Sequence, residues 1–177
     1  RVDSGRMRIT CEVLPVAGMI AEVQGLVGPS AKSAGIKLVT SSSPLADFAF
    51  ADHVRLRQCL INMIGNAIKF SKRGDTVSLR ARAETVGDKK MIVFDVADTG
   101  IGIAKGDLAN IFRPFGQGHA IGEAFGGAGL GLSISRELAR QMGGDVGVVS
   151  ELGAGSTFSL SIPAATASAL KRLERAA

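Results

Sequence analysis

The stretch LINMIGNAIKF (residues 60–70) predicts an amphipathic helix with one apolar and one polar stripe. The apolar stripe, which would face a core, consists of Leu56, Leu60, Ile64, Ala67 and Ile68. The polar stripe consists of Arg55, Cys59, Asn62, Asn66 and Lys69. An asparagine oxygen can complete the shell of a magnesium ion without adding charge, and a lysine ammonium one turn further on can meet phosphate oxygens. The helix is therefore either a cation site with a phosphate clamp or an ordinary surface helix with a polar outer face.

A second motif, DTGIGI (residues 98–103), directly follows an apolar strand. Gly100 and Gly102 let the backbone turn sharply and approach a flat ligand without an intervening side chain. The ionised carboxylate of Asp98 only accepts hydrogen bonds, so it can receive the amino group of adenine and disfavour a guanine oxygen. The alternative is a common Asp-Gly turn. A dinucleotide-binding fingerprint is set aside because its GxGxxG spacing is absent.

A third motif, GGAGLGLSIS (residues 126–135), leads into a predicted helix. Gly127, Gly129 and Gly131 can aim backbone N–H groups and the positive helix end at an anion, which makes this run a phosphate cradle. It lacks the GK[ST] ending of a P-loop. The segment between the two glycine runs, residues 102–126, contains several glycines and phenylalanines and is either a mobile lid or a plain surface loop.

Hydrophobic periodicity and turn residues divide the rest of the chain into alternating strands and helices. Pro15 suits the first position of a helix that ends at Gly35, and Asp52 is an acceptable N-cap for the asparagine-rich helix. The predicted strands are residues 7–14, 36–40, 48–50, 76–84, 91–97, 146–150 and 156–162. A hairpin across Gly87 and Asp88 joins two of them, and a last long helix covers residues 130–142.

Length, composition and charge indicate one domain. With 177 residues, of which 46% are apolar, the chain can bury a substantial core. No apolar run approaches the ~18 residues of a membrane span. The formal charge of +5 is dispersed and Trp and Tyr are absent, so a solvated basic surface is favoured over nucleic-acid binding. Cys11, Cys59, His53 and His119 lack the spacing of a metal site or a disulfide framework, and both cysteines are expected to be buried thiols.

Together with the Phe-rich turn IFRPFGQ (residues 111–117), these motifs in this order resemble the catalytic ATP-binding domain of sensor histidine kinases, within the gyrase, Hsp90, histidine kinase and mismatch-repair ATPase superfamily. The resemblance implies an α/β two-layer sandwich of the α+β kind, a Bergerat-type ATP-binding fold in which helices cover one face of a mixed sheet and a flexible lid closes the site. It also implies that residues 1–7 end a preceding helical hairpin, that residues 8–163 form the catalytic domain, and that residues 164–177 are a tail or linker.

The resemblance further implies a role for each motif residue, with ATP and Mg²⁺ as cofactors. Asn66 is the expected magnesium ligand and Lys69 a phosphate contact. Asp98 is the expected adenine reader, supported by the hydroxyl of Thr157 in the run GAGSTFSLSIP. The remaining expected nucleotide-binding residues lie in the two glycine runs and are Gly100, Gly102, Gly127, Gly129, Leu130 and Gly131.

Asn62 bears on the type of reaction. ATPases of the superfamily place a water-activating Glu one turn before the magnesium ligand, whereas Asn62 cannot act as a base near neutral pH. Hydrolysis should be slow, and the expected catalytic residues Asn62, Asn66 and Lys69 would act by positioning and charge neutralisation during transfer of the γ-phosphate to a His. Two alternatives stay open: a regulatory nucleotide-binding module without transfer, supported by Ala128 where many relatives have Thr, and a superfamily ATPase.

The acceptor His is expected outside this chain, on an adjoining dimerisation and phosphotransfer hairpin of the same bacterial protein. The absence of an initial Met agrees with a segment of something longer. A response regulator receiver domain is the second expected partner. We expect no contact with nucleic acid or membrane, a monomeric isolated domain, and a cytoplasmic location even where the parent protein is membrane-anchored.

Overall fold

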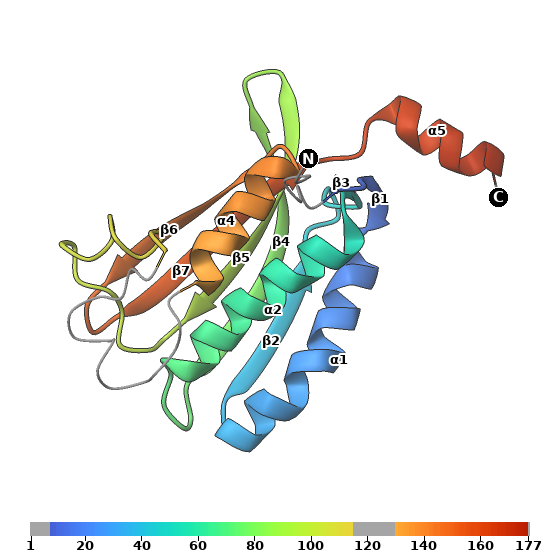
Figure 1. Cartoon of the computed structure of the whole chain (residues 1–177). Helices are drawn as coiled ribbons and strands as arrows, with labels where there is room; N and C mark the ends of the chain where they lie inside the picture. Colours follow the sequence, from blue (N-terminus) through green and yellow to red (C-terminus); the bar gives the residue numbers. More distant parts are fainter. Residues whose placement is uncertain (1–7, 115–129, 177) are drawn as a thin grey trace, which may run out of the picture.

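The structure, a computed structural model that describes residues 8–114 and 130–176, has a layer of helices on a β-sheet (Figure 1). Its elements are β1 (Glu12–Pro15), α1 (Val16–Ala34), β2 (Lys37–Ser42), β3 (Phe48–Ala51), α2 (His53–Lys69), β4 (Thr76–Val86), β5 (Lys89–Asp98), α4 (Gly131–Gln141), β6 (Asp145–Glu151), β7 (Gly155–Pro163) and α5 (Ala167–Ala176). The main sheet has the strand order β2-β4-β5-β7-β6, and α1, α2 and α4 cover one of its faces (Figure 1). The predicted two-layer architecture is confirmed.

The main sheet is mixed, as predicted. Strand β2 runs parallel to β4, and every other pair of neighbours is antiparallel. The hairpin of β4 and β5 turns at Gly87, whose φ of 60° suits a residue without a side chain. On the face away from the helices, the carboxylate of Asp95 accepts hydrogen bonds from Arg82 Nε at 2.7 Å and Ser159 Oγ at 2.6 Å. This face is therefore polar along the central strands.

The hydrophobic core lies between the sheet and the helices. The apolar stripe predicted for residues 60–70 is the core face of α2, since Leu56, Leu60 and Ile64 are fully buried. Phe94 of β5 is also fully buried, and each such side chain stabilises the fold by roughly 2 kcal/mol relative to exposure. Because the apolar face of α2 is buried in the core, its opposite face is the one available for other contacts.

Helix α1 ends as predicted at Gly35, which adopts a left-handed conformation with φ 70°. The segment before this helix differs from the prediction in two details. Pro15 has a helix-compatible φ of −64° but an extended ψ of 122°, so it closes β1 and precedes the helix as N-cap. Strand β1 begins only at Glu12, because residues 8–11 have no regular structure.

Asp52 caps α2 and also holds the chain ahead of β1. Its Oδ1 accepts a hydrogen bond from Arg55 N at 3.0 Å, and its Oδ2 accepts one from Thr10 N at 2.9 Å. Burial alone would raise the pKa of this carboxyl, but backbone hydrogen bonds and the charge of Arg55 together outweigh burial, so the pKa is lowered. The predicted N-cap is confirmed, and the same side chain joins α2 to the segment before β1.

The C-terminal segment continues beyond the sheet into α5, which stands away from the two layers (Figure 1). Leu173 on this helix is half-exposed. Among residues 8–114 and 130–176, no helix combines the length and the apolar character needed to cross a bilayer.

Candidate nucleotide-binding site

The polar stripe of α2 lies partly against α4. Asn62 Nδ2 donates a hydrogen bond to Ser135 Oγ at 3.0 Å, and Cys59 Sγ donates to the backbone oxygen of Ser135 at 3.6 Å. Cys59 is fully buried, which raises the pKa of its thiol to about 11 and keeps it a neutral donor. The alternative of a solvent-facing polar stripe is therefore wrong for this part of the helix. Asn66 is half-buried and Lys69 is exposed.

Gly131, the first residue of α4, packs directly on Asn62. A Cβ atom at Gly131 would lie 2.3 Å from Asn62 Oδ1, so the two helices approach closely only because this side chain is missing. Leu130 precedes the helix at its N-cap position. Gly127, Gly129 and residues 115–126 of the predicted lid lie outside the described residues.

Asp98 ends β5 and is half-buried. Its Oδ1 accepts a hydrogen bond from Gly100 N at 2.9 Å. Burial raises the pKa of this carboxyl; the backbone N–H groups of Gly100 and Ser156 oppose the shift, and the charge of Asp75 adds to it. Asp98 therefore holds its charge less readily than an exposed carboxylate. Its ionised form is a strong acceptor because it is partly shielded from water.

The glycines after Asp98 serve close packing of backbone on backbone. A Cβ atom at Gly100 would lie 2.4 Å from the backbone oxygen of Phe70, at the end of α2. Gly102 has φ 69°, and its Cβ would lie 1.9 Å from the backbone oxygen of Glu151. The space left by the missing side chains is thus filled by the protein itself. Packing within the protein thus explains both glycines, and a contact of their backbone with a nucleotide stays a prediction.

The hydroxyl next to Asp98 in the sheet is that of Ser156. In the pairing of β5 with β7, Asp98 faces Ser156, while Thr157 faces Ala97. Because successive strand residues point to opposite faces, Thr157 lies on the other face of β7 from Ser156. Ser156 is buried, and its hydroxyl lies 2.8 Å from that of Ser150. In the strand pairing, Ser156 and not Thr157 is therefore the hydroxyl residue opposite Asp98, while the support of Asp98 by Thr157 stays a prediction.

A cavity of about 740 Å³ opens beside Asp98 at the end of the sheet. Its lining comes from the loop after β5 and from the β6–β7 turn: Asp98, Ile103, Ala104, Lys105, Val149, Ser150, Glu151, Leu152, Ala154, Gly155, Ser156 and Thr157. Asp98 and Thr157 thus share one cavity. The predicted residues on α2 and α4 do not line it.

Helix α2 is the element on which the three motifs meet. Its contact with α4 is at Asn62, and its contact with the loop after Asp98 is at Phe70, whose backbone oxygen accepts a hydrogen bond from Ile101 N at 3.4 Å. Asn66 lies four residues from each of these contacts, and hence on the same helix face. The Nζ atom of Lys69 lies 5.5 Å from the ring centroid of Phe70.

The side chains of Asn66, Lys69 and Asp98 have the chemistry that a magnesium nucleotide requires. The amide oxygen of Asn66 suits the cation, the ammonium of Lys69 suits phosphate, and the carboxylate of Asp98 can accept a hydrogen bond from the adenine amino group. Within residues 8–114 and 130–176, no three His, Cys, Asp or Glu side chains gather into a metal-binding group. His53 Nε2 lies 2.8 Å from Glu22 Oε2 and so links α1 to α2, while His119 lies outside the described residues.

Comparisons with known proteins show the family of the chain. Residues 51–166 match the family described as histidine kinase-, DNA gyrase B-, and HSP90-like ATPase. The chain is 36% identical over 168 residues to the aerobic respiration control sensor protein ArcB of Escherichia coli (strain K12), covering 93% of this chain and 21% of ArcB. It is 34% identical over 167 residues to the autoinducer 2 sensor kinase/phosphatase LuxQ of Vibrio parahaemolyticus, covering 92% of this chain and 19% of LuxQ. The chain thus spans about a fifth of the length of these curated relatives.

Solved structures share the fold. Full-length ShkA in complex with AMPPNP superposes with a TM-score of 0.77 at 38% identity, over 91% of this chain and 32% of ShkA. The nucleotide-free catalytic domain of histidine kinase ThkA, at 23% identity, shares the fold with a TM-score of 0.72 over 89% of this chain and 97% of that domain. The chain belongs to the histidine kinase-, DNA gyrase B- and HSP90-like ATPase family, as an ATP-binding catalytic domain of the sensor histidine kinase type.

Proposed function

We propose that this domain binds Mg-ATP along α2 and supplies the γ-phosphate to a histidine on an adjoining dimerisation hairpin of its parent protein. The observation that carries the proposal is the position of Asn66, one helical turn from the contact with α4 at Asn62 and one turn from the contact with the Asp98 loop at Phe70. A ligand held by Asn66 therefore has the first turn of α4 on one side and the adenine-reading loop on the other.

Each motif residue has a chemical part in this proposal. The amide oxygen of Asn66 coordinates magnesium, and the ammonium of Lys69 contacts phosphate oxygens. The carboxylate of Asp98 accepts the adenine amino group, held in place by the N–H of Gly100. Gly127, Gly129, Leu130 and Gly131 offer backbone N–H groups to the phosphates at the start of α4. Bound magnesium supplies charge neutralisation for the phosphoryl group.

Asn62 favours transfer to histidine over hydrolysis. Its side chain has no basic group, and its amide is already bonded to Ser135. A neutral imidazole is nucleophilic without a base, so positioning is the main task left to the protein. We propose that residues 8–163 form this transfer module, that residues 1–7 end the preceding hairpin, and that a receiver domain of a response regulator accepts the phosphoryl group afterwards.

Two measurements test the proposal. Calorimetric titration of the chain with ATP should give binding that requires magnesium and is weaker for GTP. The parent protein with its hairpin should incorporate the terminal phosphate of labelled ATP at a histidine, identified by its acid lability and loss on substitution of that histidine. Magnesium-dependent binding without incorporation would mean a regulatory module. ATP turnover at several per second by the chain alone, on the order expected of an ATPase, would also contradict the proposal.

A further inference from the structure

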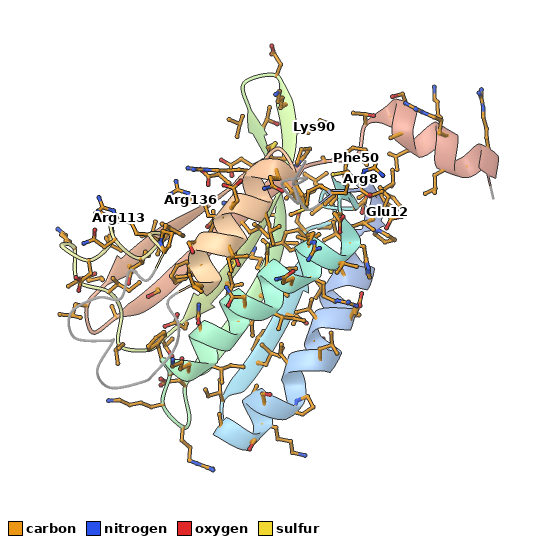
Figure 2. The ribbon with its side chains drawn as sticks, viewed as in Figure 1. Arg8, Glu12, Phe50, Lys90, Arg113 and Arg136 are labelled. Carbon is orange, nitrogen blue, oxygen red and sulfur yellow. The ribbon has the colours of Figure 1, made fainter. Side chains whose placement is uncertain are left out.

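Arg136 of α4 makes two contacts with one guanidinium group. Its Nε and Nη2 atoms donate hydrogen bonds to the two carboxylate oxygens of Asp145, at 2.8 and 3.2 Å. The Cζ atom of the same group lies over the ring of Phe112, 4.7 Å from the ring centroid. In Figure 2, Arg136 lies on the same side of the molecule as Arg113, the residue after Phe112. One guanidinium group thus contacts both β6, through Asp145, and the Phe-rich turn, through Phe112.

Phe112 is held from a second side by the sheet. Its ring meets the ring of Phe158 edge to face, with centroids 6.4 Å apart and an interplanar angle of 79°. The preceding residue, Ile111, is buried. Phe112 therefore lies between a strand of the main sheet and the guanidinium of α4, and its position depends on both.

The contact joins two segments that flank the second glycine run in the sequence. Phe112 precedes residues 115–129 and Arg136 follows them. Ser135, the neighbour of Arg136, accepts the hydrogen bond of Asn62 on α2. The same turn of α4 therefore contacts α2 through Ser135 and the Phe-rich turn through Arg136.

We propose that Arg136 is a positioning residue for nucleotide binding: by stacking on Phe112 while bonded to Asp145, it fastens the Phe-rich turn to α4 and so sets the relative position of the two segments that flank the glycine run. The inference rests on the proposed function, since it assigns Arg136 to the same nucleotide site. A lysine is a poor substitute because an ammonium cannot both stack flat and bond a carboxylate with a fork of donors.

Arg140 offers a matched control. It bonds the same carboxylate, with Nε 3.2 Å from Asp145 Oδ1 and Nη2 3.4 Å from Oδ2. Within the described part of the chain, the ring contact of Phe112 is with Arg136 and not with Arg140. Loss of Arg140 therefore removes a charge and an Asp145 partner but keeps the stacking on Phe112.

The experiment measures the dissociation constant for Mg-ATP by calorimetry, with the fraction of folded protein checked by circular dichroism for each variant. Arg136→Ala and Phe112→Leu should each weaken binding about tenfold, and the double variant should be no weaker than either single one. Arg136→Lys should behave like Arg136→Ala. Phe112→Tyr, which keeps the ring face, and Arg140→Ala should stay within about twofold of the wild type.

Three outcomes would overturn the inference. One is equal affinity in the wild type, Arg136→Ala and Phe112→Leu; the second is additive losses in the double variant; the third is a loss in Arg140→Ala as large as in Arg136→Ala. If Arg136→Ala does not fold, Arg136→Lys and Phe112→Leu still decide the matter. A wild-type chain that binds no ATP would instead refute the proposed function itself, and the inference with it.

Discussion

The side-chain amide of Asn62 donates a hydrogen bond to the hydroxyl of Ser135 across 3.0 Å, and this bond joins α2 to α4 one turn from Asn66. Asn62→Ala and Ser135→Ala should each lower the free energy of unfolding by about 1 kcal/mol, because each leaves the other group without its partner. The Asn62/Ser135 double variant should lose little more than either single variant. Urea unfolding at neutral pH measures all three, and strictly additive losses would show that the two side chains do not depend on each other.

Substitution of the proposed magnesium ligand should affect only magnesium-dependent binding. Asn66→Ala removes the amide oxygen that we assign to the cation, so the affinity for ATP should fall by about tenfold or more with magnesium present and stay near the wild-type value in chelator. Gln58→Ala, an exposed polar position on the same helix, is the control. Unchanged Mg-ATP affinity in Asn66→Ala would place the cation elsewhere.

Asp98 should determine the preference for adenine and its dependence on pH. Asp98→Asn puts a donor where an acceptor-only group stood, so the ratio of ATP to GTP affinity should fall. Because burial raises the pKa of the wild-type carboxyl, its ionised form should be lost at a higher pH than that of an ordinary Asp. As the solution is acidified, ATP affinity should therefore begin to decline at a pH above the ordinary Asp pKa of about 4, and it should decline less in Asp98→Asn.

Comparing the pH profiles of the wild type and Asp98→Asn separates the titration of the Asp98 carboxyl from that of the nucleotide. The triphosphate titrates equally with both proteins, so only the difference between their pH profiles reports Asp98. Parallel profiles, or an ATP to GTP ratio that does not change in Asp98→Asn, would remove Asp98 from the adenine site.

Gly102 should be required for folding stability. A side chain there would combine a φ of 69° with a Cβ only 1.9 Å from the backbone oxygen of Glu151, and neither can be relieved by a rotamer change. Gly102→Ala should destabilise the protein by on the order of 3 kcal/mol, measured by thermal or urea unfolding. Gly147→Ala is the control, because no atom lies within 4 Å of the Cβ that it would add. Equal stability of the two variants would contradict the described course of the loop.

Low pH should lower the folding stability of the protein, because carboxylates that accept hydrogen bonds in the folded state become protonated. The hydrogen bond from Arg136 lowers the pKa of Asp145 to about 2, so its stabilisation is complete above the ordinary pKa of about 4 and is lost as the pH falls towards 2. Asp145→Asn should be less stable than the wild type at neutral pH and less sensitive to pH in this window. The Asp52 carboxyl, whose pKa is also lowered, contributes in the same direction and remains in the variant. Urea midpoints of the wild type and Asp145→Asn at several pH values measure the difference in their stability. This difference should shrink as the pH falls and be nearly gone near pH 2.

Much of the fold followed from local patterns. The apolar stripe of α2, the N-cap at Asp52 and the left-handed end of α1 at Gly35 are set by residues near one another in the sequence, and these predictions are confirmed. Both ends of β1 were predicted wrongly. Pro15 belongs to the strand because its ψ is extended, and the strand starts only at Glu12, where pairing with β3 begins, because alternation alone does not show how far a pairing partner reaches.

The site was less accessible to such reasoning because it depends on contacts between distant segments. Cys59 belongs to the polar stripe by spacing, yet α4 buries it. The sequence alone did not show that strand pairing places Ser156, not Thr157, opposite Asp98. The role of Thr157 as a support for the adenine carboxylate stays a prediction. The reason for Gly100 and Gly102, close backbone packing against Phe70 and Glu151, becomes visible only in three dimensions.

The buried carboxylate of Asp52 has a mechanical consequence. One oxygen holds the backbone of Thr10 and the other holds the first turn of the helix that carries Asn66. A pull or twist applied to the chain at Thr10 must either displace α2 along with it or leave a shielded anion short of a partner, which is energetically unfavourable. A force applied to the chain before β1 therefore acts on the N-terminus of α2, the helix that carries Asn66.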